Sequence, residues 1–339
     1  MNPLPRGARN GGGAMQIGLD VGYSHVKACC NGRRVSFPSV VGSPDRPSFS
    51  LGEERGILLQ VPGPALVGED AVEQSRFLRR REDRQWVVSE EWYCLALAAI
   101  SELTDLMSLD PVIVTGLPVA FYSDKDQVLD RLVGSHRIER AGRRPQLVHV
   151  TPASCRVIPQ PFGAILAAAL DEGGRIVDQD LATGRVGLID VGGKTANILA
   201  VKGLREISHE TTSVNAGAWD VVRAVRGWLN EHCPNLDLRD HQVVEAIIRR
   251  QVRYYGELLD LNQVVEAAVE PLAREVIAQA SQLWNGGAAL DAILIAGGGA
   301  HLLGGYIQQH FRHARVVDQP VFANAIGFWR YAQRLAGRV

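Results

Sequence analysis

The chain has 339 residues, of which 46% are hydrophobic and 22% are charged, and its formal net charge is −1. A chain of this length is too long to fold around one ordinary hydrophobic core and suits two domains. The composition is that of a globular protein and excludes a disordered chain. The near-zero net charge gives no reason to expect direct binding to nucleic acid or to an anionic membrane. No apolar run approaches the roughly 18–20 residues that span a bilayer, so no transmembrane segment is expected.

The N-terminus and the cysteines point to a reducing compartment. Residues 1–14 contain Pro, Gly and Arg but no hydrophobic stretch, so we expect a flexible tail, or an upstream start before Met15, and not a secretory signal. The five cysteines show no CxxC spacing and predict buried thiols, without a disulfide framework or a zinc site. Cys29 and Cys30 are neighbours on a predicted strand and should point to opposite faces. A cytoplasmic location is the resulting expectation.

The first part of the chain predicts short strands joined by tight turns. An apolar strand over residues 15–19 runs into Asp20-Val21-Gly22, and a second strand is expected at 25–30. Asn31-Gly32 predicts a hairpin before a third strand at 33–37. The Pro-, Gly- and Ser-rich residues 38–70 predict a small, loop-rich subdomain.

The sequence after residue 70 predicts alternating helices and strands. Apolar residues at helical or strand spacing give the following expectations: helices at 90–107, 162–171, 216–231, 240–256, 263–284 and 323–335, and buried strands at 110–116, 187–190 and 292–296. The last of these strands runs into three glycines and a further helix.

One internal similarity links the two parts of the chain. Residues 19–27 align with residues 189–197, because each segment is an apolar strand, then Asp-Val-Gly, then a polar turn with a hydroxyl residue, then a second apolar strand. One copy lies in each half of the chain. The pair therefore indicates a duplicated architecture with a cleft between the halves.

Both turns could hold phosphate. A tight turn presents consecutive backbone N–H groups, and glycine allows the close approach that a phosphate needs. The candidate residues are Gly22, Tyr23 and Ser24 in the first turn, and Gly192, Gly193, Lys194 and Thr195 in the second. Either turn alone is better explained as an ordinary hairpin with a capping Asp. Their occurrence together favours two facing phosphate cradles.

Acidic and basic residues beside the turns complete this hypothesis. Asp20 and Asp190 head the two turns, where a carboxylate would hold a hydrated Mg²⁺ that bridges phosphate oxygens. Lys27 is placed to neutralise phosphate charge. We therefore predict Asp20 and Asp190 as metal ligands.

The glycine-rich turn over residues 297–299 is a further candidate. A strand, three glycines and a helix let a ribose or α-phosphate lie against bare backbone, which makes Gly297, Gly298 and Gly299 candidate nucleotide contacts. The pattern is not GxGxxG, and no GxxxxGK[ST] occurs, so a Rossmann site and a Walker A loop are disfavoured. A close helix–strand crossing is the alternative explanation.

Gln160 lies between two prolines before a predicted helix. Pro159 and Pro161 fix its direction, and a glutamine held rigidly at a helix start can orient an attacking water without being a strong base. A polar turn residue without a catalytic role is the alternative.

With these elements in this order, the sequence resembles the actin-like ATPases of the actin/sugar-kinase/chaperone superfamily. Their signature has five segments: phosphate 1, connect 1, phosphate 2, adenosine and connect 2. The similar segments here are 17–27, 157–166, 188–198, 293–300 and a helix around 324–329. The resemblance covers residues 15–335.

The resemblance implies an α/β, actin-like ATPase fold of two duplicated ribonuclease-H-like domains flanking a nucleotide cleft. Domain I would comprise residues 15–160 and 320–339, with a small loop-rich subdomain at about 33–85. Domain II would comprise 161–319, with a helical subdomain at about 216–260. Gly217 joins the expected nucleotide contacts, and Gln160 and Asp190 become the expected catalytic residues.

Within this superfamily the chain looks most like the bacterial ParM/StbA group and its archaeal relatives. That likeness implies ATP or GTP binding with Mg²⁺, hydrolysis, and nucleotide-dependent head-to-tail filaments for plasmid or other DNA segregation through an adaptor protein. Two departures are visible. Gln160 stands where many ParM-type proteins have Glu, and Lys194 and Asn197 stand where a hydroxyl residue and Asp are frequent.

Two other functions remain open at this point. A small-molecule kinase of the same superfamily would need an acidic general base in the cleft, and no Asp in a clear sugar-binding context is evident. A non-polymerising ATPase or chaperone-like module would ordinarily carry a separate substrate-binding domain, for which the chain shows no segment.

Overall fold

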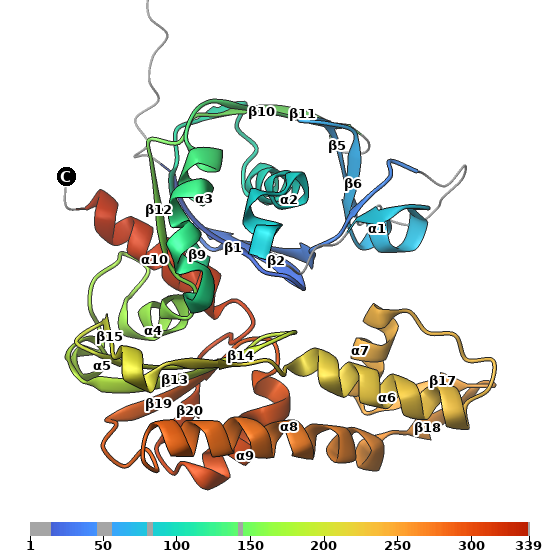
Figure 1. Cartoon of the computed structure of the whole chain (residues 1–339). Coiled ribbons are helices and arrows are strands. Elements are labelled where there is room, and N and C mark those ends of the chain that lie inside the picture. Colours follow the sequence, from blue (N-terminus) through green and yellow to red (C-terminus); the bar gives the residue numbers. More distant parts are fainter. Residues whose placement is uncertain (1–14, 46–55, 80–83, 142–144, 338–339) are drawn as a thin grey trace, which may run out of the picture.

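The computed structural model describes residues 15–45, 56–79, 84–141 and 145–337 (Figure 1). The expected tail at residues 1–14 lies outside this part of the chain. No helix within the described ranges is both long and apolar enough to cross a membrane. The molecule consists of two α/β halves, each built on a sheet of the same topology.

The sheet of the first half has five strands. They are β1 (Gln16–Val21), β2 (His25–Cys30), β3 (Arg33–Pro38), β9 (Val112–Leu117) and β12 (Ser154–Pro159), in the order β12-β9-β1-β2-β3. β1, β2 and β3 pair antiparallel, whereas β9 and β12 continue the sheet in parallel. The predicted Asn31-Gly32 hairpin is confirmed, with φ values of 46° and 78°.

The sheet of the second half repeats this pattern. Its strands are β13 (Arg185–Val191), β14 (Ala196–Lys202), β15 (Arg205–Glu206), β16 (Thr212–Val214), β19 (Ala292–Ala296) and β20 (Ala314–Val316). β13 pairs antiparallel with β14 and parallel with β19, as β1 does with β2 and β9. The register places Asp20 opposite Lys27 and Asp190 opposite Asn197. The duplication inferred from the sequence is confirmed.

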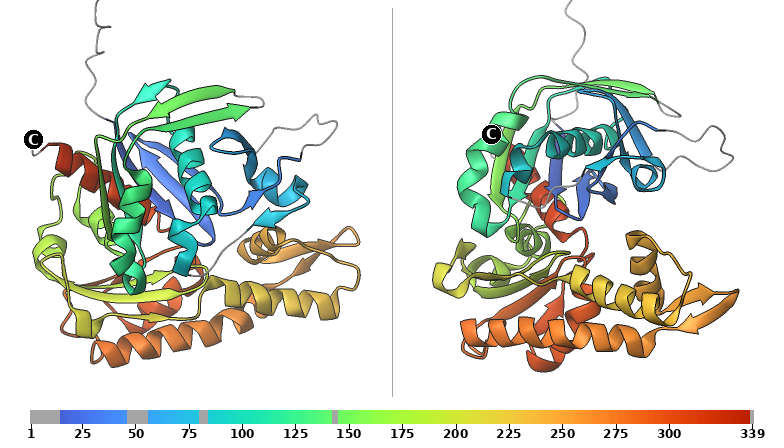
Figure 2. Two further views of the ribbon diagram at one scale, coloured as in Figure 1. Left: turned by 45° about the horizontal axis from the view of Figure 1, so that its top comes forward. Right: turned by 45° about the vertical axis from the view of Figure 1, so that its right-hand side comes forward.

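Each of these two sheets is covered by helices on both faces, because successive side chains of a strand point to opposite sides. The helices are α2 (Glu90–Glu102) and α10 (Ala323–Ala336) in the first half, and α4 (Phe162–Ala169), α6 (Ala218–His232), α8 (Asn262–Leu283) and α9 (Ala300–His310) in the second. Cys30 packs in the α2 core and Cys29 against α10, as the alternation predicts. Both views in Figure 2 keep the blue and cyan first half and the orange second half on opposite sides of the molecule.

Helices α4 and α10 lie between the two sheets and cross at glycines. A Cβ atom at Gly327 would lie 1.7 Å from the carbonyl oxygen of Gly163, and a Cβ atom at Gly163 would lie 2.6 Å from Cα of Asn324. The two backbones are therefore in direct contact. The chain enters the second half immediately before α4 and returns to the first half at α10, so this crossing joins the halves.

Within the expected loop-rich subdomain at about 33–85, the described residues contain more regular structure than expected: β3 belongs to the first sheet, and four further strands belong to a seven-stranded sheet. Its members are β4 (Val41–Gly42), β5 (Gly56–Val61), β6 (Ala65–Gly68), β7 (Leu78–Arg79), β8 (Ser108–Leu109), β10 (His136–Ala141) and β11 (Gln146–Val150). Several have only two residues and pair with strands far along the chain, so local patterns do not reveal them. Figure 1 shows α2 between this sheet and β1–β2.

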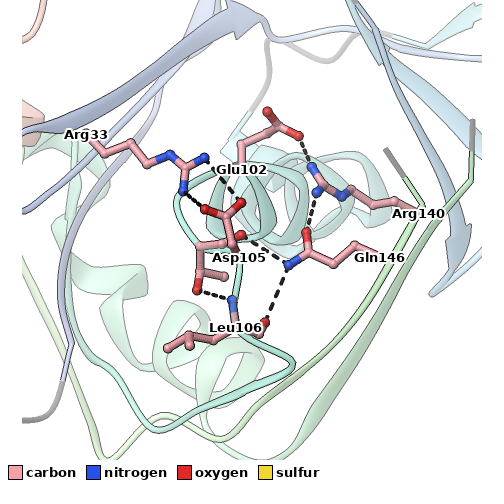
Figure 3. A network of polar contacts seen from close by, with 7 residues as sticks. Arg33, Glu102, Asp105, Leu106, Arg140 and Gln146 are labelled. Atoms are coloured by element: carbon pink, nitrogen blue, oxygen red, sulfur yellow. Dashed lines mark hydrogen bonds and ion pairs between the residues drawn. The ribbon is translucent and has the colours of Figure 1, made fainter. Parts of the chain in front are cut away.

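A polar network fastens this sheet to the end of α2 (Figure 3). The buried Arg140 guanidinium donates to the Glu102 carboxylate and to the Gln146 side-chain oxygen. The Gln146 amide in turn donates to the backbone carbonyl of Thr104 at 3.1 Å. A buried arginine is tolerated when its charge is paired. Glu102 pairs the charge of Arg140, and the network ties the seven-stranded sheet to the core.

Two predicted helices end earlier than expected. The helix predicted at 90–107 ends at Glu102. The one predicted at 240–256 ends at Arg249, because Arg250 adopts a left-handed conformation with φ 58°, and a hairpin with Tyr255 and Gly256 at positive φ follows. That hairpin is β17 (Gln251–Tyr254) and β18 (Glu257–Asp260), so the expected helical subdomain at about 216–260 also contains strands.

Short elements complete the described fold. They are α1 (Glu69–Gln74), η1 (Arg84–Val88), η2 (Val119–Asp124), α3 (Lys125–Leu132), α5 (Gln179–Thr183), η3 (Ser208–Glu210) and α7 (Asp240–Arg249). The exact domain boundaries given above stay a prediction.

The α4–α10 crossing predicts a strong asymmetry between two glycines. Gly327→Ala should lower the free energy of unfolding by about 3 kcal/mol or more, because its methyl group has no space against backbone. Gly305→Ala, inside α9 where an added Cβ atom meets nothing within 4 Å, should be neutral or stabilising. Thermal melts of both variants would check this, and equal stability of the two would contradict the packing described here.

Candidate functional site

A cleft of about 390 Å³ lies where the two halves meet. Its polar floor is formed at the carboxyl ends of β1, β12, β13 and β19. The predicted site residues that line it are Asp20, Gly22, Tyr23, Ser24, Lys27, Gln160, Asp190, Gly192, Gly193, Lys194, Thr195, Gly297 and Gly298. Gly217 and Gly299 are not among its lining residues.

The two Asp-headed turns face each other in this cleft. A Cβ atom at Gly193 would lie 3.2 Å from Cβ of Ser24. The Lys194 ammonium lies 5.6 Å from the centre of the Tyr23 ring. Turns from separate halves of the chain thus come within contact distance, as the duplicated motif predicts.

Asp20 is buried at the end of β1 and is held from two directions. Gln160 Nε2 donates to Asp20 Oδ1 at 2.6 Å, and Lys27 Nζ lies 3.9 Å from Oδ2. Burial raises the pKa of Asp20, while the Lys27 charge and the Gln160 hydrogen bond lower it. Gln160 is therefore in contact with the carboxylate expected to bind metal.

Asp190 occupies the matching position at the end of β13. Asn324 Nδ2 donates to its Oδ2 at 3.1 Å, and Asn324 Oδ1 accepts from the backbone N–H of Ala164 on α4. Burial raises the pKa of Asp190, the Asn324 hydrogen bond lowers it, and the nearby Asp20 charge raises it again. The two carboxylates therefore disfavour each other's ionisation across the cleft.

This pair of carboxylates fits a divalent cation. A cation between Asp20 and Asp190 would remove their repulsion and offset the cost of burying both charges. Within the described residues no group of three or more His, Cys, Asp or Glu side chains is arranged to hold a metal. Further ligands would have to be water or phosphate oxygens, which is the coordination that Mg²⁺ ordinarily takes in nucleotide sites.

The glycine turn after β19 packs directly on the Asp190 carboxylate. Gly297 has φ +88°, and a Cβ atom there would lie 2.5 Å from Asp190 Oδ1. Only glycine suits this position. At Gly298 an added Cβ atom would meet nothing within 4 Å, so its backbone is open to the cleft.

Gly217 and Gly299 lie behind the cleft and support it. A Cβ atom at Gly217 would lie 2.5 Å from the Gly193 carbonyl oxygen, and one at Gly299 would lie 2.4 Å from the Val191 side chain. The N–H of Trp219 in the first turn of α6 donates to the Gly193 carbonyl at 2.8 Å. These two glycines let α6 and α9 approach the second turn.

The sequence analysis did not predict the residues that form the apolar walls of the cleft. Trp86 on η1 lies in the first half with its ring centre 6.0 Å from that of Tyr23, and Val87 follows it. The opposite wall comes from α6 and α7 and consists of Trp219, Val222, Val244 and Ile248. No local spacing marks these residues as a group. Asn324 was located in a signature segment, but its contact with Asp190 was not predicted.

Two family models match the chain. Residues 18–163 match the model "Actin like proteins N terminal domain" and residues 188–309 match "Archaeal actin homologue MreB-like, C-terminal". Together they cover more than half of the chain, and the interval between them contains most of α4. No curated protein sequence matches the chain.

Solved structures with the same fold include filament proteins. An archaeal actin homologue, Ta0583, has a TM-score of 0.77 at 21% identity, over 95% of this chain and 99% of that chain. Apo ParM of pSK41 gives 0.75 at 16% identity, over 96% and 99%. ParM from a 15-stranded filament of Clostridium botulinum gives 0.75 at 23% identity, over 95% and 99%. These similarities establish the fold.

The raised pKa of Asp190 predicts a pH-dependent gain in stability for Asp190→Asn. Asparagine keeps an acceptor for Asn324 and removes the buried charge. In the wild type, ionisation of the buried Asp190 lowers the free energy of unfolding. This loss of stability is absent when the pH is below the unfolded-state pKa of about 4, and it is fully present when the pH is above the raised pKa of the folded protein. Without nucleotide and with EDTA, the variant's melting temperature should therefore exceed the wild type's by roughly 2–4 °C at neutral pH, and the difference should shrink on acidification.

The exposed Asp110 supplies the control for this comparison. Asp110→Asn should melt with the wild type throughout the pH range. A lower melting temperature for Asp190→Asn at neutral pH would show that the carboxylate is not the destabilising group we describe.

Proposed function

Because the chain belongs to the actin-like proteins, we propose that it is a nucleoside triphosphatase that binds ATP or GTP with Mg²⁺ in the cleft and assembles into nucleotide-dependent filaments. The observation that carries this proposal is the pair of facing turns headed by Asp20 and Asp190, one from each half of the chain. A ligand that bridges both turns must connect the halves.

The shape and chemistry of the cleft support a nucleotide. The polyphosphate would lie between the two turns, where backbone N–H groups and Lys27 meet its charge. The open backbone at Gly298 would accept the ribose, and the apolar walls carrying Trp86 and Trp219 would contain the base. The solved structure of Ta0583 with ADP is of a protein with this fold.

Gln160 is the residue that we propose to position the attacking water. Its amide nitrogen is engaged with Asp20, which fixes the direction of the side chain. When bound, Mg²⁺ would neutralise charge on the phosphate oxygens. Gln160 would hold a water in line with the terminal phosphate, and its low basicity suits slow hydrolysis.

Cleft closure is the proposed link between nucleotide and assembly. The halves also touch at a second place, beyond the apolar walls: Arg239 Nη1 donates to the Val72 carbonyl at 2.7 Å, and His241 lies 3.8 Å from the Glu73 carboxylate. Such exposed contacts contribute little energy and can break and reform. Closure would fix the relative orientation of the halves, and a head-to-tail contact that does not close on itself then propagates.

The biological role that we propose is cytomotive, in segregation of a plasmid or other DNA through an adaptor protein, in the cytoplasm. Support comes from the ParM of Clostridium botulinum, whose filament has been solved and whose fold this chain shares. A small-molecule kinase of the same superfamily would be indicated if a sugar panel, and not assembly, responded to nucleotide.

The proposal predicts assembly that depends on nucleotide. Pelleting and light scattering should show assembly with Mg-ATP or Mg-GTP and little without nucleotide, and electron microscopy should show filaments. Lys27→Ala should bind nucleotide more weakly and require more nucleotide to assemble. Absence of assembly across a range of protein and salt concentrations would overturn the filament role.

The position of Gln160 predicts a separation of binding from hydrolysis. Gln160→Ala should lower the rate of phosphate release about tenfold to a hundredfold, because the water is no longer oriented. Nucleotide affinity should remain within about threefold of the wild type, since Gln160 contributes no charge. Measurement of single-turnover hydrolysis beside equilibrium binding would check both parts, and an unchanged rate would remove Gln160 from the mechanism.

A further inference from the structure

Asn324 lies where the α4–α10 crossing meets the cleft. It belongs to the first turn of α10 and is 7% exposed. A Cβ atom at Gly163 of α4 would lie 2.6 Å from its Cα atom, so its backbone is part of the crossing. Asn324 also lines the cleft. One residue therefore belongs both to the joint between the halves and to the site between them.

Two hydrogen bonds fix the direction of the Asn324 amide group. Its Oδ1 accepts from the backbone N–H of Ala164 on α4 at 3.0 Å, and that N–H also meets the Pro161 carbonyl at 3.2 Å. A backbone N–H can only donate, so the amide oxygen must face α4. The amide nitrogen then faces Asp190 and donates to its Oδ2 at 3.1 Å. The first turn of α4 thus determines that Asp190 receives a donor.

The carboxylate of Asp190 relies on this donor more than that of Asp20 relies on a single partner. Asp20 accepts a hydrogen bond and also has the Lys27 ammonium 3.9 Å away. On the other side of Asp190, Oδ1 packs against Gly297, where an added Cβ atom would lie 2.5 Å away. The Asp190 carboxylate is therefore confined between a glycine backbone and the Asn324 amide.

The backbone of Asn324 and its two hydrogen-bond partners belong to opposite halves. Helix α4 packs on the second sheet, where Ile165 shares a buried cluster with Leu188 of β13. Helix α10 packs on the first sheet, where Phe328 shares a buried cluster with Val114 of β9. A change in the relative orientation of the halves therefore moves the Asn324 amide with respect to both of its partners.

We propose that Asn324 is a positioning residue through which the relative orientation of the two halves sets the position of the Asp190 carboxylate. In the present orientation the amide holds this carboxylate at the cleft floor. In a different orientation the bond breaks and the carboxylate is free to rotate. Because such coupling is reciprocal, a ligand that fixes Asp190 favours the orientation in which Asn324 holds it. The inference rests on the proposed nucleotide function.

Hydrolysis and binding should separate when the amide is removed. Asn324→Ala should lower the single-turnover rate of hydrolysis about tenfold or more, because an unheld carboxylate does not keep its productive position. Nucleotide affinity should stay within about threefold of the wild type. Asn324→Asp keeps an acceptor for the Ala164 N–H but presents an oxygen to Asp190, so it should be as slow as Asn324→Ala.

Gln333→Ala supplies the matched control. Gln333 is a polar residue of the same helix, and it donates to Asn31 Oδ1 at 3.3 Å away from the residues that line the cleft. This variant should hydrolyse and bind nucleotide as the wild type does. Thermal melts establish that each variant is folded.

Hydrogen exchange gives a readout that does not depend on hydrolysis. A non-hydrolysable analogue of ATP, or of GTP if that binds more tightly, should slow amide exchange in the first turn of α4 about threefold or more in the wild type. In Asn324→Ala the analogue should still slow exchange in the turn at residues 192–195 but leave α4 unchanged. The wild-type measurement tests the coupling even if a variant does not fold.

The outcomes separate this inference from the proposed function. If the wild type binds nucleotide but exchange in α4 does not change, or if Asn324→Ala hydrolyses at the wild-type rate, Asn324 is not a positioning residue and the nucleotide function stands. The same conclusion holds if Asn324→Ala loses affinity and rate by equal factors. If the wild type binds neither ATP nor GTP, the proposed function fails and the inference fails with it.

Discussion

The carboxylates of Asp20 and Asp190, which come from opposite halves of the chain, are buried beside the same cleft and raise the energy of each other's ionised form. Each is held by an amide. Gln160, at the entry to the second half, donates to Asp20, and Asn324, at the return to the first half, donates to Asp190. The two segments that join the halves therefore also hold the two charges. Sheet registers, the tight turns and the glycines at the crossing all maintain this arrangement.

Uncharged side chains at positions 160 and 197 limit the charge beside the two carboxylates. A glutamine at position 160 can donate a hydrogen bond to Asp20, whereas a glutamate there would add a third negative charge to a poorly solvated site. Asn197, opposite Asp190, likewise adds no charge, and its oxygen accepts from Ser213 Oγ at 2.7 Å. The cleft thus limits its negative charge to the two positions suited to a cation.

Features encoded by contiguous residues were predictable from the sequence. The Asp-Val-Gly turns, the Asn31-Gly32 hairpin and the strands around them depend on local patterns, and the structure has them where expected. The two-residue strands of the seven-stranded sheet were not predictable, because they are defined by distant partners. The hairpin after Arg249 was missed because helical periodicity conceals the left-handed residue that ends α7. For the site, the polar floor was found and the apolar walls were not, since Trp86 and Ile248 come together only through tertiary packing.

The crossing of α4 and α10 at Gly163 and Gly327 has a mechanical consequence. Backbone touches backbone there, so a relative rotation of the two halves would have to pivot about a contact that contains almost no side-chain atoms. The cleft floor lies close to this crossing, while the contact between His241 on α7 and Glu73 on α1 lies far from it. In such a rotation, a displacement of a fraction of an ångström at the carboxylates would produce a larger displacement at the far ends of the two halves, where a neighbouring molecule would meet it.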